Sequence, residues 1–410
     1  MKTITEPQKN LQIIDEYDVL VLGGGVAGVS AALSAARCGA KTALIERYGY
    51  LGGQATGGLV ILIVGLTDGK NPIFGGNCRE MIYDLSRLGA AQALGRHVLF
   101  NPEYMKLLLD SKLLENNVNL YYHRYVAGAI TENGKIKAVI TEGKSGRHAI
   151  AAKMFVDATG DADLAKYCDI PYNMPEKNNL MPVTLGFRVG GLDLERVGEF
   201  IRNNYTHFRE MYATAGVPPK VGGWVRTMNP NEAWFNVAHA VNIDPTDSES
   251  LTDAELETRR RALELVNVFK EKIPGFENGY IIDTAAQIGV RDSRRIKGLY
   301  TFEEKDISST FDDTIALAPN YTGKGGGSVE VPYSCLVTEK VENVVFCGRC
   351  ISVAHELLDM FREIPCCMAT GQAAGIAVAL AVNENRNLQD VNVSMLRKTL
   401  LEQNAILAVP

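Results

Sequence analysis

The sequence predicts an α/β protein: a Rossmann-like domain with a β-meander, into which an α+β domain with a mixed or antiparallel sheet is inserted. Three observations predict this fold. An apolar run near the N-terminus stops at closely spaced glycines and is followed by an alanine-rich segment. Two later apolar runs also stop at glycines, near residues 160 and 348. Between these two runs, extended segments surround one long charged stretch, which favours a separate α+β unit.

The first element is a strand over 17–22, because YDVLVL is apolar throughout, as a strand buried on both faces requires. Gly23, Gly25 and Gly28 then follow with GxGxxG spacing. The first glycine permits a tight turn, the second admits a pyrophosphate, and the third lets the next helix pack closely on the strand. The N-terminus of that helix favours phosphate. The next strand, KTALIE, ends at Glu46, whose carboxylate suits ribose hydroxyls and repels a 2′-phosphate.

NAD and FAD share this fingerprint, so the remaining elements must decide between them. A second glycine loop, RYGYLGGQATGG, follows Glu46 directly, where an NAD domain usually enters its next crossover. Later strands end at DATGD (157–161) and at Gly348, and a helix rich in small residues, IPCCMATGQAAGIAVALAV, closes the pattern. A mononucleotide fold that long insertions interrupt, and that a C-terminal strand and helix complete, favours FAD over NAD.

Six segments resemble the FAD-dependent oxidoreductase family of glutathione-reductase-like flavoproteins, which is distantly similar to the fumarate reductase flavoprotein group. They are GGGVAGVSAALSAARCGAKTALIERYGYLGG, FVDATGDADLA, GVRDSRRIKG, VPYSCLV, GRCISVAHE and PCCMATGQAAG. The resemblance implies a two-domain flavoprotein that binds FAD in an extended conformation. Fumarate-reductase-type proteins often attach FAD to a histidine in the loop after the ribose-binding acid. This loop, LGGQATGG, has no histidine, so we expect non-covalent FAD.

The predicted FAD site combines the two glycine loops, the ends of the later strands, and the helix that begins near Pro365. Backbone N–H groups at the start of that helix are expected to face the pyrimidine end of the flavin. The resemblance places the first strand of the meander, with Val126, near the adenine. The residues expected to bind FAD are Gly23, Gly25, Val26, Ala27, Gly28, Glu46, Arg47, Gly52, Gly53, Gln54, Ala55, Val126, Ala158, Thr159, Gly160, Asp161, Gly348, Arg349, Pro365, Thr370, Gly371, Gln372 and Ala373.

The domains are expected to be discontinuous in sequence. We assign residues 14–60, 99–171 and 335–385 to the FAD-binding domain, and residues 61–98 and 172–334 to a substrate or cap domain. The tail, 386–410, is expected to be helical. The cap should lie over the flavin ring, because ligands of such sheets bind outside the carboxyl ends of the strands.

Four polar residues are the candidates for catalysis: Arg291, Tyr333, His355 and Arg362. Arg291 lies in QIGVRDSRR, where it binds an anionic substrate or pairs with nearby acids. His355 follows a strand end and suits acid–base chemistry, and Arg362 lies two turns further on if the run is helical. Tyr333 either donates a proton or packs. In the alternative reading of Arg291, it only braces the domain interface.

Cysteines suggest two further sites, and neither is favoured. The CGRC at 347–350 resembles a redox pair, and Cys366 with Cys367 would complete a zinc set. A redox pair normally opens a helix, whereas Cys347 closes an apolar strand, and adjacent cysteines are poor tetrahedral ligands. We therefore expect buried thiols and no metal.

Composition excludes several classes of function. The net charge of −6 gives no general attraction for nucleic acid. The N-terminus lacks an apolar core of the signal-peptide type, and the longest apolar runs, LVILIVGL and GIAVALAV, are too short to span a bilayer. Eight cysteines without framework spacing indicate a reducing compartment, so a cytoplasmic location is expected.

The function predicted is an FAD-dependent oxidoreductase that exchanges hydride between flavin N5 and a small, anionic or oxygen-rich metabolite. Only one GxGxxG exists, so the electron donor or acceptor is expected to share the flavin's pocket or to be another protein. An oligomer is compatible with the sequence. The alternatives are an electron-transfer subunit of a larger complex and a flavoprotein with non-redox use of FAD. A nucleic-acid-modifying flavoenzyme is disfavoured by the acidic balance.

Overall fold

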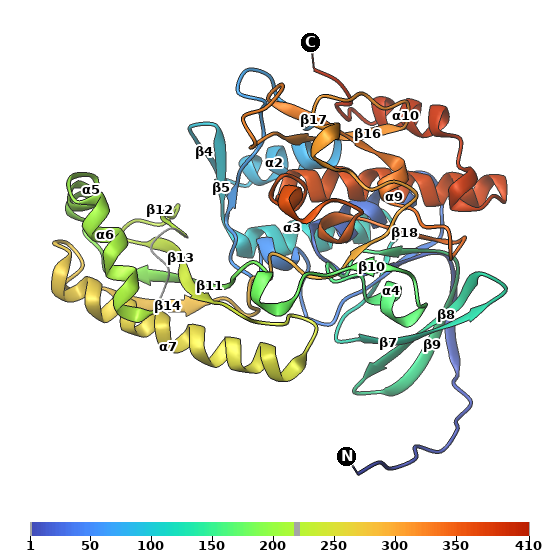
Figure 1. Cartoon of the computed structure of the whole chain (residues 1–410), viewed down its shortest axis with the longest axis horizontal. Coiled ribbons are helices and arrows are strands. Elements are labelled where there is room, and N and C mark those ends of the chain that lie inside the picture. Colours follow the sequence, from blue (N-terminus) through green and yellow to red (C-terminus); the bar gives the residue numbers. More distant parts are fainter. Residues whose placement is uncertain (1, 217–221, 410) are drawn as a thin grey trace.

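The computed structural model describes residues 2–216 and 222–409 and has two lobes (Figure 1). The larger lobe is built on a sheet in the order β6-β2-β1-β9-β8-β7, with β18 paired to β9. Its strands are β1 (Ile13–Leu22), β2 (Thr42–Ile45), β6 (Asn119–Tyr121), β7 (Tyr125–Glu132), β8 (Lys135–Gly143), β9 (Gly146–Asp157) and β18 (Val344–Phe346).

Strand β9 joins two kinds of pairing in this sheet. It pairs antiparallel with β8, and β8 pairs antiparallel with β7, which is the predicted meander. It also pairs in parallel with β1 and, at its end, with β18, while β1, β2 and β6 continue in parallel. The carboxyl ends of β1, β2, β9 and β18 therefore meet at one edge, which is where ligands bind in such sheets.

The helices of this lobe are α1 (Val26–Arg37), α2 (Gly76–Arg87), α3 (Pro102–Glu115), α4 (Asp163–Tyr167), α8 (Leu358–Phe361), α9 (Ile364–Glu384) and α10 (Val393–Glu402). Most of them pack on one face of the sheet, whereas the meander and the short helix α4 pack on the other face. Helices α1 and α9 lie against each other in backbone contact, because a Cβ at Gly371 or Gly375 would stand 2.1 Å from the carbonyl oxygen of Ala27 or Ala31, respectively. The small residues of α9 thus pack on α1.

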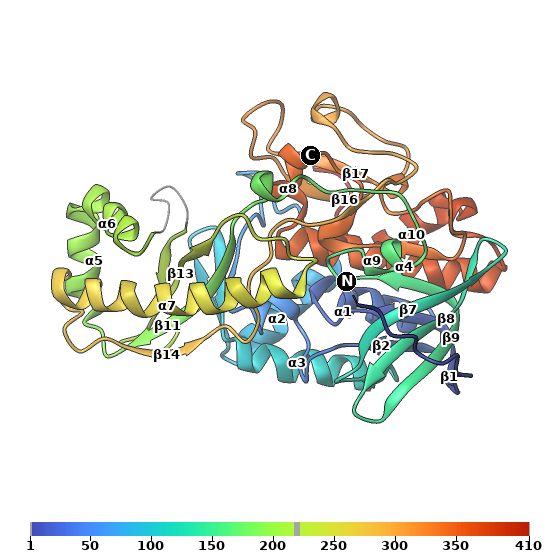
Figure 2. The same cartoon turned by 60° about the horizontal axis from the view of Figure 1, so that its bottom comes forward.

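The smaller lobe, the cap, is a four-stranded antiparallel sheet in the order β12-β13-β11-β14. Its elements are β11 (Val183–Gly190), β12 (Trp224–Arg226), β13 (Ala233–Ala240), β14 (Tyr280–Thr284), α5 (Leu194–Asn203), α6 (Tyr205–Met211) and α7 (Ser248–Lys272). Helix α7 runs along the sheet (Figure 2). Phe235 from β13 packs on Phe269 of α7 at 5.7 Å between ring centroids, so the cap has its own core.

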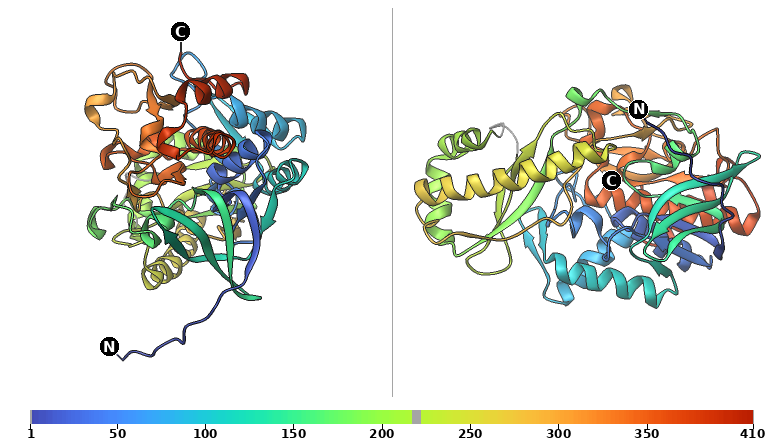
Figure 3. Two further views of the ribbon diagram at one scale, coloured as in Figure 1. Left: turned by 90° about the vertical axis from the view of Figure 1, so that its right-hand side faces the viewer. Right: turned by 90° about the horizontal axis from the view of Figure 1, so that it is seen from below.

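The remaining strands of the described residues form three small sheets. They are β3 (Leu62–Ile63), β5 (His97–Phe100) and β4 (Ala91–Leu94); β16 (Thr314–Pro319) with β17 (Ser328–Pro332); and β10 (Tyr172–Asn173) with β15 (Arg295–Ile296). The exposed N-terminal segment projects from the larger lobe (Figure 3).

The packing differs from the predicted domain boundaries in two segments. Within 61–98, Met81 and Leu85 of α2 join the core of the larger lobe, although Ile61 joins the core of the cap. Within 302–334, strands β16 and β17 also pack in the core of the larger lobe. The pattern of apolar residues in these segments indicates burial but does not say against which lobe they pack.

Helix α9 is longer and more apolar than the run GIAVALAV suggested. By length and composition it would suffice to cross a membrane, but 89% of its most apolar window is buried inside the fold. Helix α9 is a core helix of this fold, because its residues pack against α1, β16 and α10.

Candidate functional site

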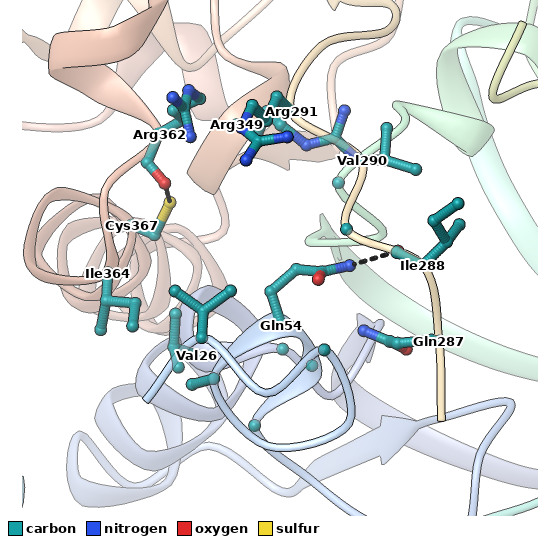
Figure 4. A pocket seen from close by; sticks show the side chains of 18 of the residues that line it. Val26, Gln54, Gln287, Ile288, Val290, Arg291, Arg349, Arg362, Ile364 and Cys367 are labelled. Carbon is teal, nitrogen blue, oxygen red and sulfur yellow. Dashed lines mark hydrogen bonds between the residues drawn. The ribbon is translucent and has the colours of Figure 1, made fainter. Parts of the chain in front are cut away.

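A cavity of about 680 Å³ lies between the two lobes, at the carboxyl ends of the parallel strands (Figure 4). From the larger lobe it is lined by the loops after β1, β2, β9 and β18 and by the start of α9. From the cap it is lined by strands β11, β12 and β13, by the N-terminal part of α7 and by residues 287–291. The cavity is thus built where the strand order predicted a ligand.

The glycines of the first loop differ in what a side chain at each position would meet. Gly23 has φ of 95°, and a Cβ there would stand 2.5 Å from the carbonyl oxygen of Ala158. A Cβ at Gly28 would stand 1.9 Å from the carbonyl oxygen of Gly23, so this glycine lets α1 meet the turn. A Cβ at Gly25 would meet no atom within 4 Å, because it would point into the cavity. This open space beside the N-terminus of α1 fits a pyrophosphate.

Glu46 lines the cavity and is held in place by backbone donors. The N–H of Gly24 donates to its Oε2 at 2.6 Å, and the N–H of Tyr48 donates to its Oε1 at 2.9 Å. A carboxylate accepts about four hydrogen bonds, so acceptor capacity remains for a ribose hydroxyl. The side chain that the fingerprint assigned to the ribose is therefore preorganised there.

The second glycine loop connects the cofactor half of the cavity with the cap. Gly52 and Gly53 both have positive φ, of 98° and 52°. Gln54 extends from this turn and donates through Nε2 to the carbonyl oxygen of Ile288 at 3.1 Å (Figure 4). Its Oε1 is buried and has no hydrogen-bond partner. An unpaired acceptor of this kind is costly unless a ligand satisfies it.

A charged cluster follows the ends of β9 and β18. Arg349 donates to Asp161 at 2.7 Å and to Ser293 at 2.6 Å, and it lines the cavity. Burial raises the pKa of Asp161, but Arg349 and Ser293 outweigh burial and lower it overall. Asp157 caps the turn by accepting from the backbone of Thr159 and Leu164. The DATGD motif therefore shapes the floor of the cavity.

Most of the predicted FAD-binding residues lie on this cavity. Those that line it are Gly23, Gly25, Val26, Ala27, Glu46, Arg47, Gly52, Gly53, Gln54, Ala55, Ala158, Thr159, Gly160, Asp161, Gly348 and Arg349. Val126 lines a smaller adjoining cavity of about 50 Å³, together with Glu46 and Arg47, which is where the meander was expected to approach the adenine.

Five predicted FAD-binding residues in α9 lie elsewhere, and their assignment is corrected. Pro365, Thr370, Gly371, Gln372 and Ala373 are buried within the fold and do not line the cavity. Thr370 accepts from the N–H of Gly348, Gln372 accepts from the N–H of Asn77, and Gly371 contacts α1. The cavity is instead lined by Glu363, Ile364 and Cys367, because only the first turn of α9 reaches it.

Two of the four catalytic candidates meet in the cavity. Arg291 donates to Thr184, to the carbonyl oxygen of Pro182 at 2.7 Å and to Asn236 at 3.2 Å. Burial, and then the nearby Arg362, lower the pKa of Arg291 to about 10. Arg362 lines the same wall and is paired with Asp359 at 2.8 Å. The two guanidinium groups come from distant parts of the chain, as predicted.

The other two candidates do not reach the cavity. Tyr333 is 3% exposed and donates to the carbonyl oxygen of Leu388 at 2.9 Å, which makes it a core residue and corrects its catalytic assignment. His355 does not line the cavity, and its Nδ1 lies 3.1 Å from Oδ2 of the buried Asp292. It also lies in a short 3₁₀ turn that ends before α8, so the expected two-turn spacing to Arg362 does not arise.

The two cysteines of the CGRC motif lie in the protein interior. Cys347 and Cys350 are fully buried, and both carry free thiols. Burial raises the pKa of each thiol well above its ordinary value, which disfavours the reactive thiolate. No group of three or more metal-ligating side chains occurs among the residues that the structure describes.

Sequence reasoning missed the residues that line the site from the cap strands, and it missed Glu363. Trp224, Trp234, Asn236 and Thr184 line the cavity from the cap strands, and Glu363 lines it from the start of α9. Thr184 and Asn236 lie in β11 and β13, and nothing in the sequence of these strands distinguishes them from other polar strand residues. The one available signal was that the chain has only two tryptophans, both in the cap.

Charges around the whole cavity are balanced. Four arginines and four carboxylates line it among the described residues: Arg47, Arg291, Arg349, Arg362, Glu46, Asp161, Glu255 and Glu363. The positive character is therefore local to Arg291, whose hydrogen-bond partners are all neutral.

Comparisons with known proteins identify the family of this chain. A family model described as FAD dependent oxidoreductase matches residues 18–400. The tRNA uridine 5-carboxymethylaminomethyl modification enzyme MnmG of Lactobacillus gasseri is 32% identical over 224 residues, covering 51% of this chain and 32% of that enzyme. The soluble pyridine nucleotide transhydrogenase of Hahella chejuensis is 29% identical over 154 residues, covering 35% and 30% respectively. The chain thus spans about a third of the length of the curated relatives it matches.

Solved structures share the fold at low sequence identity. The p-nitrophenol 4-monooxygenase PnpA from Pseudomonas putida superposes with a TM-score of 0.53 and 13% identity, over 95% of this chain and 86% of that one. A geranylgeranyl bacteriochlorophyll reductase-like protein from Thermoplasma acidophilum gives a TM-score of 0.52 and 14% identity, over 96% and 84%. With the family match over nearly the whole chain, and with glycine loops that fit a dinucleotide, we conclude that the chain belongs to the FAD-dependent oxidoreductase family and takes FAD as its cofactor.

Proposed function

We propose that this chain exchanges hydride between its FAD and a small metabolite that carries a carboxylate or a similar oxygen-rich anion. The observation that supports this most directly is Arg291, a largely buried arginine that lines the cavity with only neutral hydrogen-bond partners. When bound, FAD supplies the flavin ring that takes up or releases the hydride. The protein supplies the binding, the orientation and the local charge.

The loops after β1 and β2 would hold the adenosine and pyrophosphate parts of FAD. Gly25 and the start of α1 offer backbone donors to phosphate, and Glu46 offers acceptors to ribose. The loop of residues 51–58 contains no histidine, so attachment is proposed to be non-covalent. The segment from Gly348 to Arg349 and the first turn of α9 would border the flavin end.

Arg291 would bind the anionic group of the substrate. A partly buried cation without a hydrogen-bonded carboxylate carries a desolvation cost, which Asp359 and Glu363 offset in part and an incoming carboxylate would relieve further. Its hydrogen bonds to Thr184 and Asn236 fix the guanidinium on the cap side. A planar guanidinium binds a carboxylate through two parallel hydrogen bonds, and such a clamp orients a C–H bond for transfer.

Glu363 would hold the proton that accompanies the reaction. It lies at the N-cap of α9 without making a capping hydrogen bond, and its Oε1 is 3.9 Å from Arg362. Burial raises the pKa of Glu363, with a further increase from Asp359, while Arg362 and Arg291 act in the opposite direction. A carboxyl group of raised pKa that borders the cavity suits proton transfer at its Oε atoms.

Transfer RNA is a less favoured substrate, although some of the curated relatives are tRNA modification enzymes. This chain has a net charge of −6, whereas binding of nucleic acid depends on phosphate contacts with a surplus of cations. Fluorescence anisotropy with labelled tRNA at low salt is expected to show no saturable binding, and micromolar binding would reverse this preference.

The test begins with an anaerobic screen of carboxylate metabolites for bleaching of the flavin absorbance. For any substrate that bleaches it, Arg291→Lys should lower kcat/KM by at least about tenfold while FAD stays bound, because lysine does not reproduce the bidentate geometry. Arg260→Lys is the matched control, since Arg260 lies exposed on α7 and pairs with Glu264. If Arg291→Lys only lowers the melting temperature and leaves the kinetics unchanged, Arg291 braces the cap and the proposal is wrong.

A further inference from the structure

The apolar run LVILIVGL, residues 59–66, has no polar face. Leu59, Ile61 and Ile63 are buried in the cores of the two lobes. Val60, Leu62 and Val64 alternate with them, are only partly buried and line the cavity. A strand with one face on water normally alternates apolar with polar residues. Here the face that borders the cavity is aliphatic, which indicates that it is covered by an apolar group.

Both tryptophans of the chain border this same cavity. Trp224 is partly buried, and its ring stacks on Phe235 of the cap core at 6.3 Å. Trp234 is 7% exposed, and both residues line the cavity. Together with Val60, Leu62, Val64 and Val225 they form what we call the apolar wall. Aromatic and aliphatic walls with a few placed polar groups are typical of sites for small organic ligands.

The apolar wall begins a short distance from Arg291. Asn236 accepts a hydrogen bond from Arg291, and Trp234 lies two residues earlier on the same strand, β13. Two residues of strand span about 7 Å, so the backbone positions of Trp234 and Asn236 are separated by about the length of a ring with a short side chain. The wall and the cation therefore fit two ends of one small molecule.

Two buried polar atoms beside the wall lack partners. The indole Nε1 of Trp234, a donor only, has no hydrogen-bond partner, and neither has Oε1 of Gln54. The orientation of the Gln54 amide is fixed, since its Nε2 donates to Ile288. Both atoms lie near Gly58. A Cβ added at Gly58 would stand 2.0 Å from Oε1 of Gln54. A Cβ added at Gly186 would stand 3.1 Å from the backbone oxygen of Gly58 and also 3.1 Å from Nε1 of Trp234. A ligand with a polar atom on its ring would satisfy the indole.

We propose that the substrate is an aromatic carboxylate: a planar, mostly apolar ring against the apolar wall, a carboxylate on Arg291, and a ring acceptor facing Nε1 of Trp234. This assignment rests on the proposed function, because it takes Arg291 as the anion-binding residue. It goes further by excluding the short aliphatic acids and the highly hydroxylated acids, which would leave Val60, Leu62 and Val64 uncovered.

The experiment measures binding to the FAD-loaded protein. The probes are acetate, phenylacetate, 4-hydroxyphenylacetate and 4-methylphenol, and the readouts are tryptophan fluorescence and the flavin absorption spectrum. Since both tryptophans line the cavity, the fluorescence signal has no contribution from elsewhere. Covering about 80 Å² of ring corresponds to about thirtyfold tighter binding, so phenylacetate should exceed acetate by that factor. The hydroxyl of 4-hydroxyphenylacetate should add to this, and 4-methylphenol should bind weakly.

Variants separate the two proposals. Val64→Thr should weaken phenylacetate at least about threefold and leave acetate unchanged, because it places a hydroxyl in the wall. Trp234→Phe should remove the advantage of 4-hydroxyphenylacetate over phenylacetate. Leu263→Ser, on the exposed face of α7, is the control. If acetate binds as tightly as phenylacetate, the aromatic assignment is wrong while the anion site stands. If no carboxylate binds, the proposed function fails. If Val64→Thr releases FAD instead, the wall belongs to the cofactor and the aromatic assignment is wrong.

Discussion

Substituting alanine for Gly25 or for Gly28 should separate cofactor binding from folding. At Gly25, φ is −63° and ψ is 174°, a conformation open to any residue, and the added methyl would meet nothing within 4 Å. The fold should therefore tolerate Gly25→Ala, with an unchanged or slightly higher melting temperature without FAD. The methyl would occupy the space for the pyrophosphate. Losing one charge-assisted hydrogen bond costs about 1.5–3 kcal/mol, or about 10- to 150-fold in FAD affinity.

The Gly28→Ala substitution should instead lower the stability of the fold. The added Cβ would stand 1.9 Å from the carbonyl oxygen of Gly23, which is a backbone atom and cannot turn away as a flexible side chain could. Helix α1 would have to move away from the turn, at a cost of about 1–3 kcal/mol or more, seen as a fall of several degrees in the melting temperature. Calorimetry of the apo-proteins and titration with FAD measure the two effects. FAD affinity of wild-type strength in Gly25→Ala would show that the phosphate does not lie against this loop.

Three further predictions follow from the site. Acid precipitation should leave a colourless pellet and FAD in the supernatant, and colour in the pellet, or FMN in the supernatant, would contradict non-covalent FAD. Because burial raises the pKa of Glu363, carboxylate affinity should fall as pH rises through that pKa, where a negative charge appears beside the ligand. The Glu363→Gln variant should bind carboxylates with an affinity that depends less on pH. It should also be at least as stable as wild type at pH 8, since the fold disfavours the ionised form of Glu363. An unchanged pH profile of carboxylate affinity would show that Glu363 does not act on the ligand. Serine at both Cys347 and Cys350 should leave flavin reduction intact and cost about 1–3 kcal/mol of stability, whereas loss of turnover with FAD retained would indicate a redox pair.

The sequence alone determined the cofactor half of the molecule. Gly23, Gly25, Gly28 and Glu46 lie within one strand–turn–helix–strand unit, so their geometry follows from local backbone rules and their spacing along the chain. The turn after β9 and the loop at Gly348 were also found, because each directly follows an apolar strand. The long charged helix, α7, and the meander were predicted for the same reason: their periodicity is local.

Tertiary structure decided the rest, because the remaining contacts join residues far apart in sequence. A helix that is rich in small residues has the same sequence pattern whether its glycines face FAD or another helix. Only the packing shows that Gly371 and Gly375 touch α1. Tyr333 and Arg291 are both polar residues near apolar strands, yet the first is buried against Leu388 and the second faces the cavity. Pairing between β11 and β13 places Thr184 and Asn236 around Arg291. Local patterns fix which residues are buried, but which surfaces meet depends on how the two lobes close on each other.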